Sequence, residues 1–110
     1  EAGRAEMQRL LGRSVAEAYF CADDVLSIGA LSAIGEAGLR VPEDIGIIGL
    51  NDMEIAGWAN IALTTIHQPF EAIVRASVDL IASNFADPGR EPEVRLFPCH
   101  VVERRTLRPV

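Results

Sequence analysis

The sequence lacks the features that most readily identify membrane, secreted and nucleic-acid-binding proteins. Its 110 residues contain no apolar run near the ~20 residues that span a bilayer. The opening stretch, EAGRAEMQRL, is polar and amphipathic, which is not the pattern of a secretion signal. Acidic residues outnumber basic ones by 16 to 10, so the net charge of −6 offers nucleic acid no general attraction. We expect a protein with no membrane partner, whose contacts with DNA would need residues outside this chain.

Reactive motifs are scarce as well. Cys21 and Cys99 both lie in apolar stretches, which is typical of small buried side chains in a reducing cytoplasm. The chain has neither a glycine-rich phosphate loop nor a nucleophile elbow. His67 and His100 have no partners at metal-ligand spacing. The sequence therefore predicts a cytoplasmic protein that is not an enzyme, with no catalytic residue, no metal site and no cofactor.

The remaining pattern alternates between strands and helices. No repeat, low-complexity tract or linker interrupts it, so we expect a single unit spanning residues 1–110. Continuous β-branched runs indicate buried strands, and helical spacing of apolar residues indicates amphipathic helices. A loop with one helical turn is expected at 53–61. We expect helices at 1–12, 23–37 and 69–85, and strands at 18–22, 45–50, 63–66 and 94–106.

The expected helices have recognisable ends and apolar faces. Gly12 and Gly38 suit the positions just past two of them, and Pro69 suits the first turn of the third. Asp23 or Asp24 would cap the second helix. On that helix the expected apolar face is Val25, Ile28, Leu31 and Ile34. On the third helix it is Phe70, Ile73, Val74, Ser77, Val78, Ile81 and Phe85.

Polar residues follow three of these strands directly. Strand–helix–strand order predicts an α/β fold, in which a parallel sheet is flanked by helices. Ligands of open α/β sheets bind just beyond the carboxyl ends of the strands. We therefore expect three polar pairs to meet at one edge of the sheet. They are Asp23 and Asp24, Asn51 and Asp52, and His67 and Gln68.

Each pair also has a simpler interpretation. The two residues at 23 and 24 could only cap a helix, those at 51 and 52 could only form a turn, and those at 67 and 68 could be ordinary surface residues. The carboxylates at 23, 24 and 52 could in principle perform acid–base chemistry or bind a divalent metal. Three polar pairs at one edge nevertheless favour a shared ligand site.

Several ordered motifs resemble a known family. The stretch FCADDVLSIGALSAIGEAGLRVPEDIGIIGLNDMEIA, followed by LTTIHQP, is similar to the effector-binding region of LacI/GalR-type bacterial transcription regulators. The terminal VVERRTLRP is similar to the last strand of that family. The resemblance covers essentially the whole chain.

The resemblance implies a type I periplasmic-binding-protein-like fold, of which this chain would be the C-terminal part of the second subdomain. In such regulators a sugar or related metabolite closes a cleft between subdomains, and a dimer grips operator DNA through separate headpieces. By position, the ligand-contacting residues would be Asp23, Asn51 and Gln68, with Phe70 at the border of the cleft. The homodimer surface would include Val25, Ile28 and Trp58.

The chain also departs from the family pattern. Asp23 stands where the family usually has Asn, and Asn51 where it usually has Asp, so carboxylate and amide have exchanged places. Leu50 replaces a frequent aromatic. Carboxylates and amides suit a polyol, and Phe70 or Trp58 could cover the apolar face of a sugar, although Trp58 equally suits an interface or core position.

The headpiece and the first subdomain are absent from these residues. We therefore expect a fragment or a truncated product that binds ligand weakly and self-associates through its open sheet edge. A periplasmic sugar-binding protein and a ligand-free dimerisation module are the alternative functions.

Overall fold

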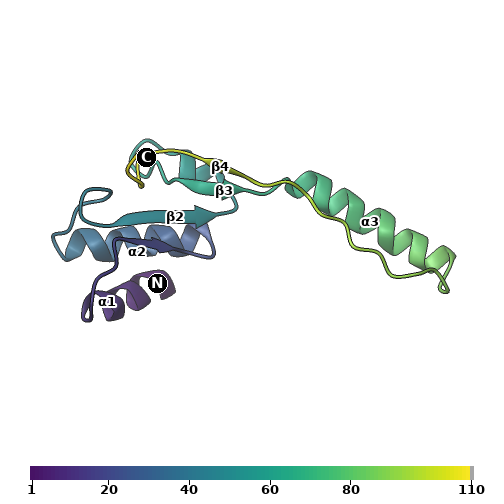
Figure 1. Cartoon of the computed structure of the whole chain (residues 1–110), viewed down its shortest axis with the longest axis horizontal. Helices are drawn as coiled ribbons and strands as arrows, with labels where there is room; N and C mark the ends of the chain where they lie inside the picture. Colours follow the sequence, from purple (N-terminus) through teal and green to yellow (C-terminus); the bar gives the residue numbers. More distant parts are fainter. Residues whose placement is uncertain (110) are drawn as a thin grey trace. The chain divides into compact units, whose positions relative to one another are not determined.

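The computed structural model describes residues 1–109, which form two compact units (Figure 1). The first unit contains Glu1–His67 and the chain from His100 onward, and the second contains Gln68–Cys99. The sequence predicts one unit, because no change of composition marks either junction. None of the described helices is long and apolar enough to cross a membrane.

The first unit is built on a four-stranded sheet in the order β1-β2-β3-β4. The strands β1 (Ala18–Phe20), β2 (Gly46–Leu50) and β3 (Thr65–His67) are parallel, as the alternation of strands and helices predicts. The last strand, β4 (His100–Val102), pairs antiparallel with β3, so the sheet is mixed rather than wholly parallel. This reversal places Ile66 opposite Val101 and His67 opposite His100.

Two helices form layers on this sheet. Helix α2 (Asp24–Glu36) packs against β2, and α1 (Ala2–Leu11) packs against α2, so that α2 lies between α1 and the sheet (Figure 1). Gly38 follows α2 with a left-handed φ of 74°, as expected for the residue past a helix, whereas Gly12 ends α1 with an ordinary φ of −73°. The buried core consists of Met7, Ala30, Ala33, Ile34, Ile45, Ile47, Ala56 and Leu63.

The buried face of α2 differs from the predicted one. Val25 is 55% exposed, and Ile28 and Leu31 are only partly buried, so of the predicted face Ile34 alone is fully buried. The residues that α2 buries are mostly small or polar: Asp24, Ser27, Ala30, Ala33 and Ile34. Small side chains allow the helix axis to approach the sheet closely, and this approach positions the polar cluster described below.

The segment after β4 forms hydrogen bonds with the first half of β2, a part of β2 that β3 does not reach. The Ile47 N–H donates to the Thr106 carbonyl, 2.8 Å away. The buried Thr106 hydroxyl donates to the Ile47 carbonyl at 2.7 Å and accepts from the Thr64 N–H at 2.9 Å. Thr106 therefore satisfies backbone groups of Ile47, in β2, and of Thr64, just before β3. It joins the two ends of the segment that contains the 3₁₀ helix η1 (Glu54–Gly57).

The second unit contains α3 (Phe70–Ala86) and an irregular return segment. Pro69 is the N-cap of α3 rather than its first residue. The helix has the predicted apolar stripe, but none of its described residues is buried, so the prediction that this face packs in a core is wrong for this chain. The exposed members are Phe70, Val74, Ser77, Val78, Ile81 and Phe85.

Candidate functional site

The carboxyl ends of β1, β2 and β3 meet at one edge of the sheet. Because these strands are parallel, the residues that follow them converge, as the sequence predicts. Asp23 follows β1 and Asn51 follows β2, and the Asn51 Nδ2 donates to the Asp23 Oδ2 at 2.9 Å. The other Asp23 oxygen accepts from the Val25 N–H at 2.7 Å, so Asp23 is also the N-cap of α2. Asp23 therefore caps α2 and also contacts Asn51, whereas its part in a shared ligand site stays a prediction.

The turn after β2 has an uncommon backbone conformation. Asn51 has a φ of 108° and Asp52 a φ of 53°, values that non-glycine residues rarely adopt. Asn and Asp tolerate the left-handed region best, because their short polar side chains bond locally. The Asn51 N–H donates to the Ile66 carbonyl at 2.9 Å, which ties this turn to β3. Consecutive residues held in such conformations are most often found at functional sites.

Asp24 is the buried centre of the cluster. Its side chain is fully inaccessible, and both of its oxygens accept hydrogen bonds. The Met53 N–H donates to Oδ2 at 2.7 Å, and the Thr65 hydroxyl donates to Oδ1 at 2.5 Å. Asp24 thus joins the start of α2 to β3 and to the loop after β2. Its role is to hold the site together, because no part of it faces solvent.

Asp52 joins His67, of the third polar pair, to the segment that follows β4. Its Oδ1 accepts from the Arg104 Nη2 at 2.7 Å, and its Oδ2 lies 3.1 Å from the His67 Nδ1. Burial acts to raise the pKa of the Asp52 carboxyl, but the hydrogen bonds with Arg104 and then His67 outweigh it, so this pKa lies below its ordinary value. Arg104 is held in turn by the Leu63 carbonyl, to which its Nη1 donates at 2.9 Å.

The lowered pKa of Asp52 predicts a contribution to acid stability. A carboxyl whose folded pKa is depressed stabilises the fold fully above its unfolded pKa of about 3.9, and this stabilisation is lost as the pH falls toward the folded value. Asp52→Asn should therefore reduce the decline of stability below about pH 4. Urea midpoints measured from pH 7 to pH 3 test this. Arg104→Gln should act in the same direction, and superimposable profiles for parent and Asp52→Asn would contradict the prediction.

The fold agrees with what the comparisons with known proteins find. A family model described as a periplasmic binding protein-like domain matches residues 1–107. The chain belongs to this family. Its predicted periplasmic-binding-protein-like fold is thereby confirmed, with the antiparallel β4 as the correction.

Relatives in this family are transcriptional regulators. The HTH-type transcriptional repressor PurR of Escherichia coli O1:K1 / APEC is 35% identical over 109 residues, which cover 97% of this chain and 32% of the repressor. A crystal structure of the lac repressor dimer bound to operator and the anti-inducer ONPF matches with a TM-score of 0.84 and 32% identity, over 96% of this chain and 37% of that one. A LacI family regulator from Enterococcus faecium with bound ribose matches with a TM-score of 0.82 and 30% identity, over 98% and 40%.

The predicted resemblance to LacI/GalR-type regulators is therefore confirmed. The chain spans about a third of the length of the curated relatives it matches. Its similarity covers part of each regulator, as expected for a region of a larger effector-binding domain.

The other predicted site residues are divided between the two units. Gln68 and Phe70 belong to the second unit, with Phe70 53% exposed at the start of α3. Trp58, at the end of η1, is 53% exposed, so it is not the core aromatic that was one of its alternatives. The role of each of these residues stays a prediction.

Two members of the cluster were missed by sequence reasoning. Thr65 was assigned only to a strand, although a Thr in the LTT motif just before a strand tip could have been recognised as a donor to nearby carboxylates. Arg104 lies 52 residues from Asp52 in the sequence, and no local pattern connects them. Only the antiparallel return of the chain brings the two together.

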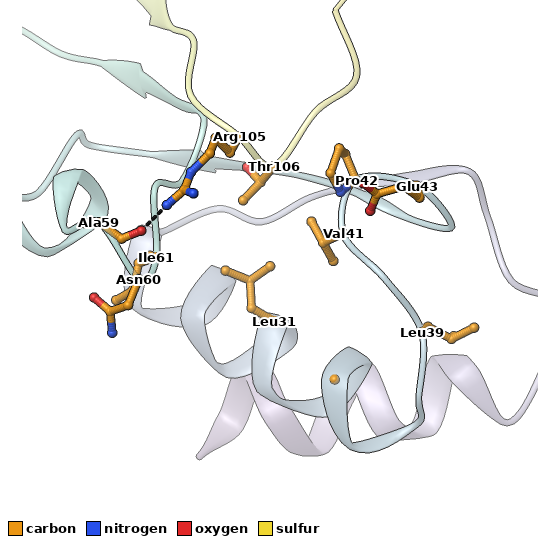
Figure 2. A pocket seen from close by; sticks show the side chains of 11 residues that line it. Leu31, Leu39, Val41, Pro42, Glu43, Ala59, Asn60, Ile61, Arg105 and Thr106 are labelled. Carbon is orange, nitrogen blue, oxygen red and sulfur yellow. Dashed lines mark hydrogen bonds between the residues drawn. The ribbon is translucent and has the colours of Figure 1, made fainter.

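A separate hollow lies near the amino end of β2 (Figure 2). It is bordered by the second half of α2, the loop that precedes β2 and the loop after η1, and the Arg105 guanidinium donates to the Ala59 carbonyl across one side. None of the polar cluster residues lines it. Its lining is Leu31, Gly35, Leu39, Val41, Pro42, Glu43, Ala59, Asn60, Ile61, Arg105 and Thr106.

Proposed function

We propose that this chain is the effector-binding and dimerisation portion of a cytoplasmic LacI-type transcriptional regulator that senses a sugar or a related small metabolite. The chain's part is to bind and not to catalyse. DNA is contacted through a headpiece that lies outside these residues, since an acidic chain of net charge −6 offers phosphates no attraction.

The observation that carries this proposal is the bonded pair of Asp23 and Asn51 at the carboxyl edge of the parallel strands. A carboxylate accepts hydroxyl protons, whereas an amide both donates and accepts, so together they suit a polyol. Both residues are only partly buried, which leaves the pair within reach of a ligand. The left-handed turn at Asn51 and Asp52 fixes the direction in which the amide leaves the backbone.

The relatives support a sugar-like effector and a DNA-linked role. A structure from the same family holds bound ribose, and another is a repressor dimer on its operator. In this chain, Gln68 would add a further amide to the ligand and Phe70 would cover an apolar sugar face. Because carboxylate and amide have exchanged places between positions 23 and 51, the negative charge of the Asp23–Asn51 pair lies at the start of α2 rather than at position 51.

Calorimetric titration of the complete gene product with pentoses, hexoses and nucleosides tests the proposal. Asn51→Gly is the informative variant, because glycine accepts a φ of 108° and so removes the amide without straining the turn. Effector affinity should fall by about 1–3 kcal/mol, as expected when one polar partner of a buried hydrogen bond is lost. Asn60→Ala, at an exposed asparagine outside the cluster, is the control.

Two results would contradict the effector proposal. One is the absence of binding to any compound of the panel by a folded, complete protein. The other is a folded Asn51→Gly variant whose affinity equals that of the parent. In the second case the Asp23–Asn51 pair would be only a structural turn.

We also expect the exposed apolar side chains of the first unit to contribute to a homodimer. Val25 is 55% exposed and Trp58 is 53% exposed, and Ile28 lies partly buried on the same helix as Val25. A tryptophan at an interface contributes most when it leaves water completely, and aliphatic side chains add the burial of their apolar surface. Val25→Asp should therefore weaken self-association in sedimentation velocity experiments at high protein concentration.

A matched control is available in the same unit. Val15 is 48% exposed and lies outside every helix and strand, so Val15→Asp introduces the same charge away from the proposed surface. It should leave the sedimentation behaviour unchanged. A parent chain that sediments as a monomer at high concentration would contradict the dimer proposal and leave the effector site unaffected.

A further inference from the structure

The two histidines of the chain form a cross-strand pair. His67 ends β3 and His100 begins β4, and the antiparallel register places them directly opposite each other. Their ring centroids are 4.9 Å apart with an interplanar angle of 35°. Directly opposed residues of an antiparallel pair project on the same face of the sheet, so the two imidazoles lie side by side there.

The surroundings of His67 prepare one of its nitrogens for coordination. The Asp52 Oδ2 lies 3.1 Å from the His67 Nδ1, and an ionised carboxylate can only accept, so Nδ1 is the protonated nitrogen. The lone pair of the neutral ring is then on Nε2. A carboxylate that orients a histidine in this way is the usual outer partner of a metal-bound imidazole, and it also makes the ring a better donor.

We propose that His67 and His100 form a two-histidine site for a divalent transition metal of the Zn²⁺ or Ni²⁺ class. Within residues 1–109 no group of three histidine, cysteine, aspartate or glutamate side chains could hold a metal, so the protein supplies two imidazole ligands and water completes the coordination. His100 is exposed and the His67 side chain is 39% exposed, which leaves room for these waters.

The local charges favour this class over Mg²⁺ and Ca²⁺. Asp52 is the nearest carboxylate of the cluster, and the Arg104 guanidinium already neutralises it at 2.7 Å. The site therefore offers imidazole nitrogens without a surplus of anionic oxygen. Imidazole suits Zn²⁺ and Ni²⁺, whereas Mg²⁺ and Ca²⁺ require oxygen ligands.

Metal binding would join β3 and β4 at a defined place. His67 is the last residue of the first unit before the chain enters the second, and His100 is the first residue after it returns. Their pairing is the final rung of the β3–β4 ladder. A metal held by both imidazoles would stop this end of the ladder from fraying, and it would raise the melting temperature of the chain because it binds only the folded form.

Calorimetric titration of the 110-residue chain with NiSO₄ and with ZnCl₂ tests this site. We expect one metal ion to bind per chain. His100→Gln and His67→Gln should each lower the metal affinity by at least about tenfold. Asp52→Asn should lower it by about 10–100-fold, because Asp52 orients the His67 ring. The metal should raise the melting temperature of the parent but not of His100→Gln. Because His100 is exposed, the far-ultraviolet circular dichroism of His100→Gln should match that of the parent in the absence of metal.

Cys99→Ser and Cys21→Ser are the controls for coordination by thiols. Cys99 is exposed and adjacent in sequence to His100, so a site built on that cysteine must be distinguished from the histidine pair. Both serine variants should bind metal as tightly as the parent. The proposal is overturned if the parent binds neither metal, if a folded His100→Gln binds equally well, or if Cys99→Ser abolishes binding.

Discussion

Asp24→Ala should lower the free energy of unfolding by about 4 kcal/mol, because it leaves one buried and one partly buried donor without an acceptor at about 1–3 kcal/mol each. These donors are the Met53 N–H at 2.7 Å and the Thr65 hydroxyl at 2.5 Å. Asp24 is fully buried, so water cannot replace the lost oxygens without entering the core. Domains are stable by only about 5–15 kcal/mol, so this change removes a large share of the total.

Two conservative variants separate the acceptor role of Asp24 from its volume. Asp24→Asn keeps the shape and one acceptor, and the Thr65 hydroxyl can rotate to accept from the new amide, so the cost should be about 1 kcal/mol. Thr65→Val keeps the shape and removes the donor to Asp24, together with the acceptor of a longer bond from the Asp52 N–H at 3.4 Å. Urea denaturation of the single variants and of Asp24→Ala/Thr65→Val should show a coupling of about 0.5–3 kcal/mol. Additive effects would show that the hydroxyl and the carboxyl do not depend on each other.

The convergence of polar residues could be predicted because it depends on local signals and one general rule. Runs such as Ile45–Leu50 are strongly β-branched, and the residues after them are abruptly polar. A strand–helix–strand order then predicts parallel pairing, which holds for β1, β2 and β3 and places the tips of these three strands at one edge. The meeting of Asp23 and Asn51 at one edge follows from these facts, and the structure adds that the two side chains are hydrogen-bonded at 2.9 Å.

The antiparallel β4 could not be predicted from its own sequence. The stretch from 94 to 106 has no regular alternation, and only His100–Val102 is strand in the structure. Without the direction of this strand, His67 and His100 appear unrelated at 33 positions apart, yet they are register partners. The Asp52–Arg104 ion pair was unpredictable for the same reason, since it depends on where the returning chain lies.

Helix faces were predicted incorrectly because size and hydrophobicity do not decide which face is buried. Residues such as Val25 are large and apolar, yet α2 turns Ser27, Ala30 and Ala33 toward the core. A helix that lies close to a sheet needs small side chains on its buried face. Hydrophobic periodicity does not take the size of side chains into account. In α3 the period was read correctly, and no described element buries the stripe.

Gly49→Ala should destabilise the chain by about 3 kcal/mol, the upper end of what overpacking costs in a rigid core. A Cβ built on Gly49 would lie 2.3 Å from the Asp24 Oδ1 and 2.9 Å from the Ser27 Oγ. The carboxyl cannot move aside, because its two hydrogen bonds hold it against β3 and the loop after β2. The added methyl group must therefore push the start of α2 away from the sheet.

Gly35→Ala provides a matched substitution with the opposite sign. Gly35 lies in α2 with no atom within 4 Å of an added Cβ, so alanine there should stabilise the chain by up to about 1 kcal/mol through helix propensity.

In an Asp24→Ala background, Gly49→Ala should cost clearly less than in the parent, because the clashing oxygen is gone. An equal cost in both backgrounds would mean that the backbone of β2, rather than the approach of α2, requires glycine at this position.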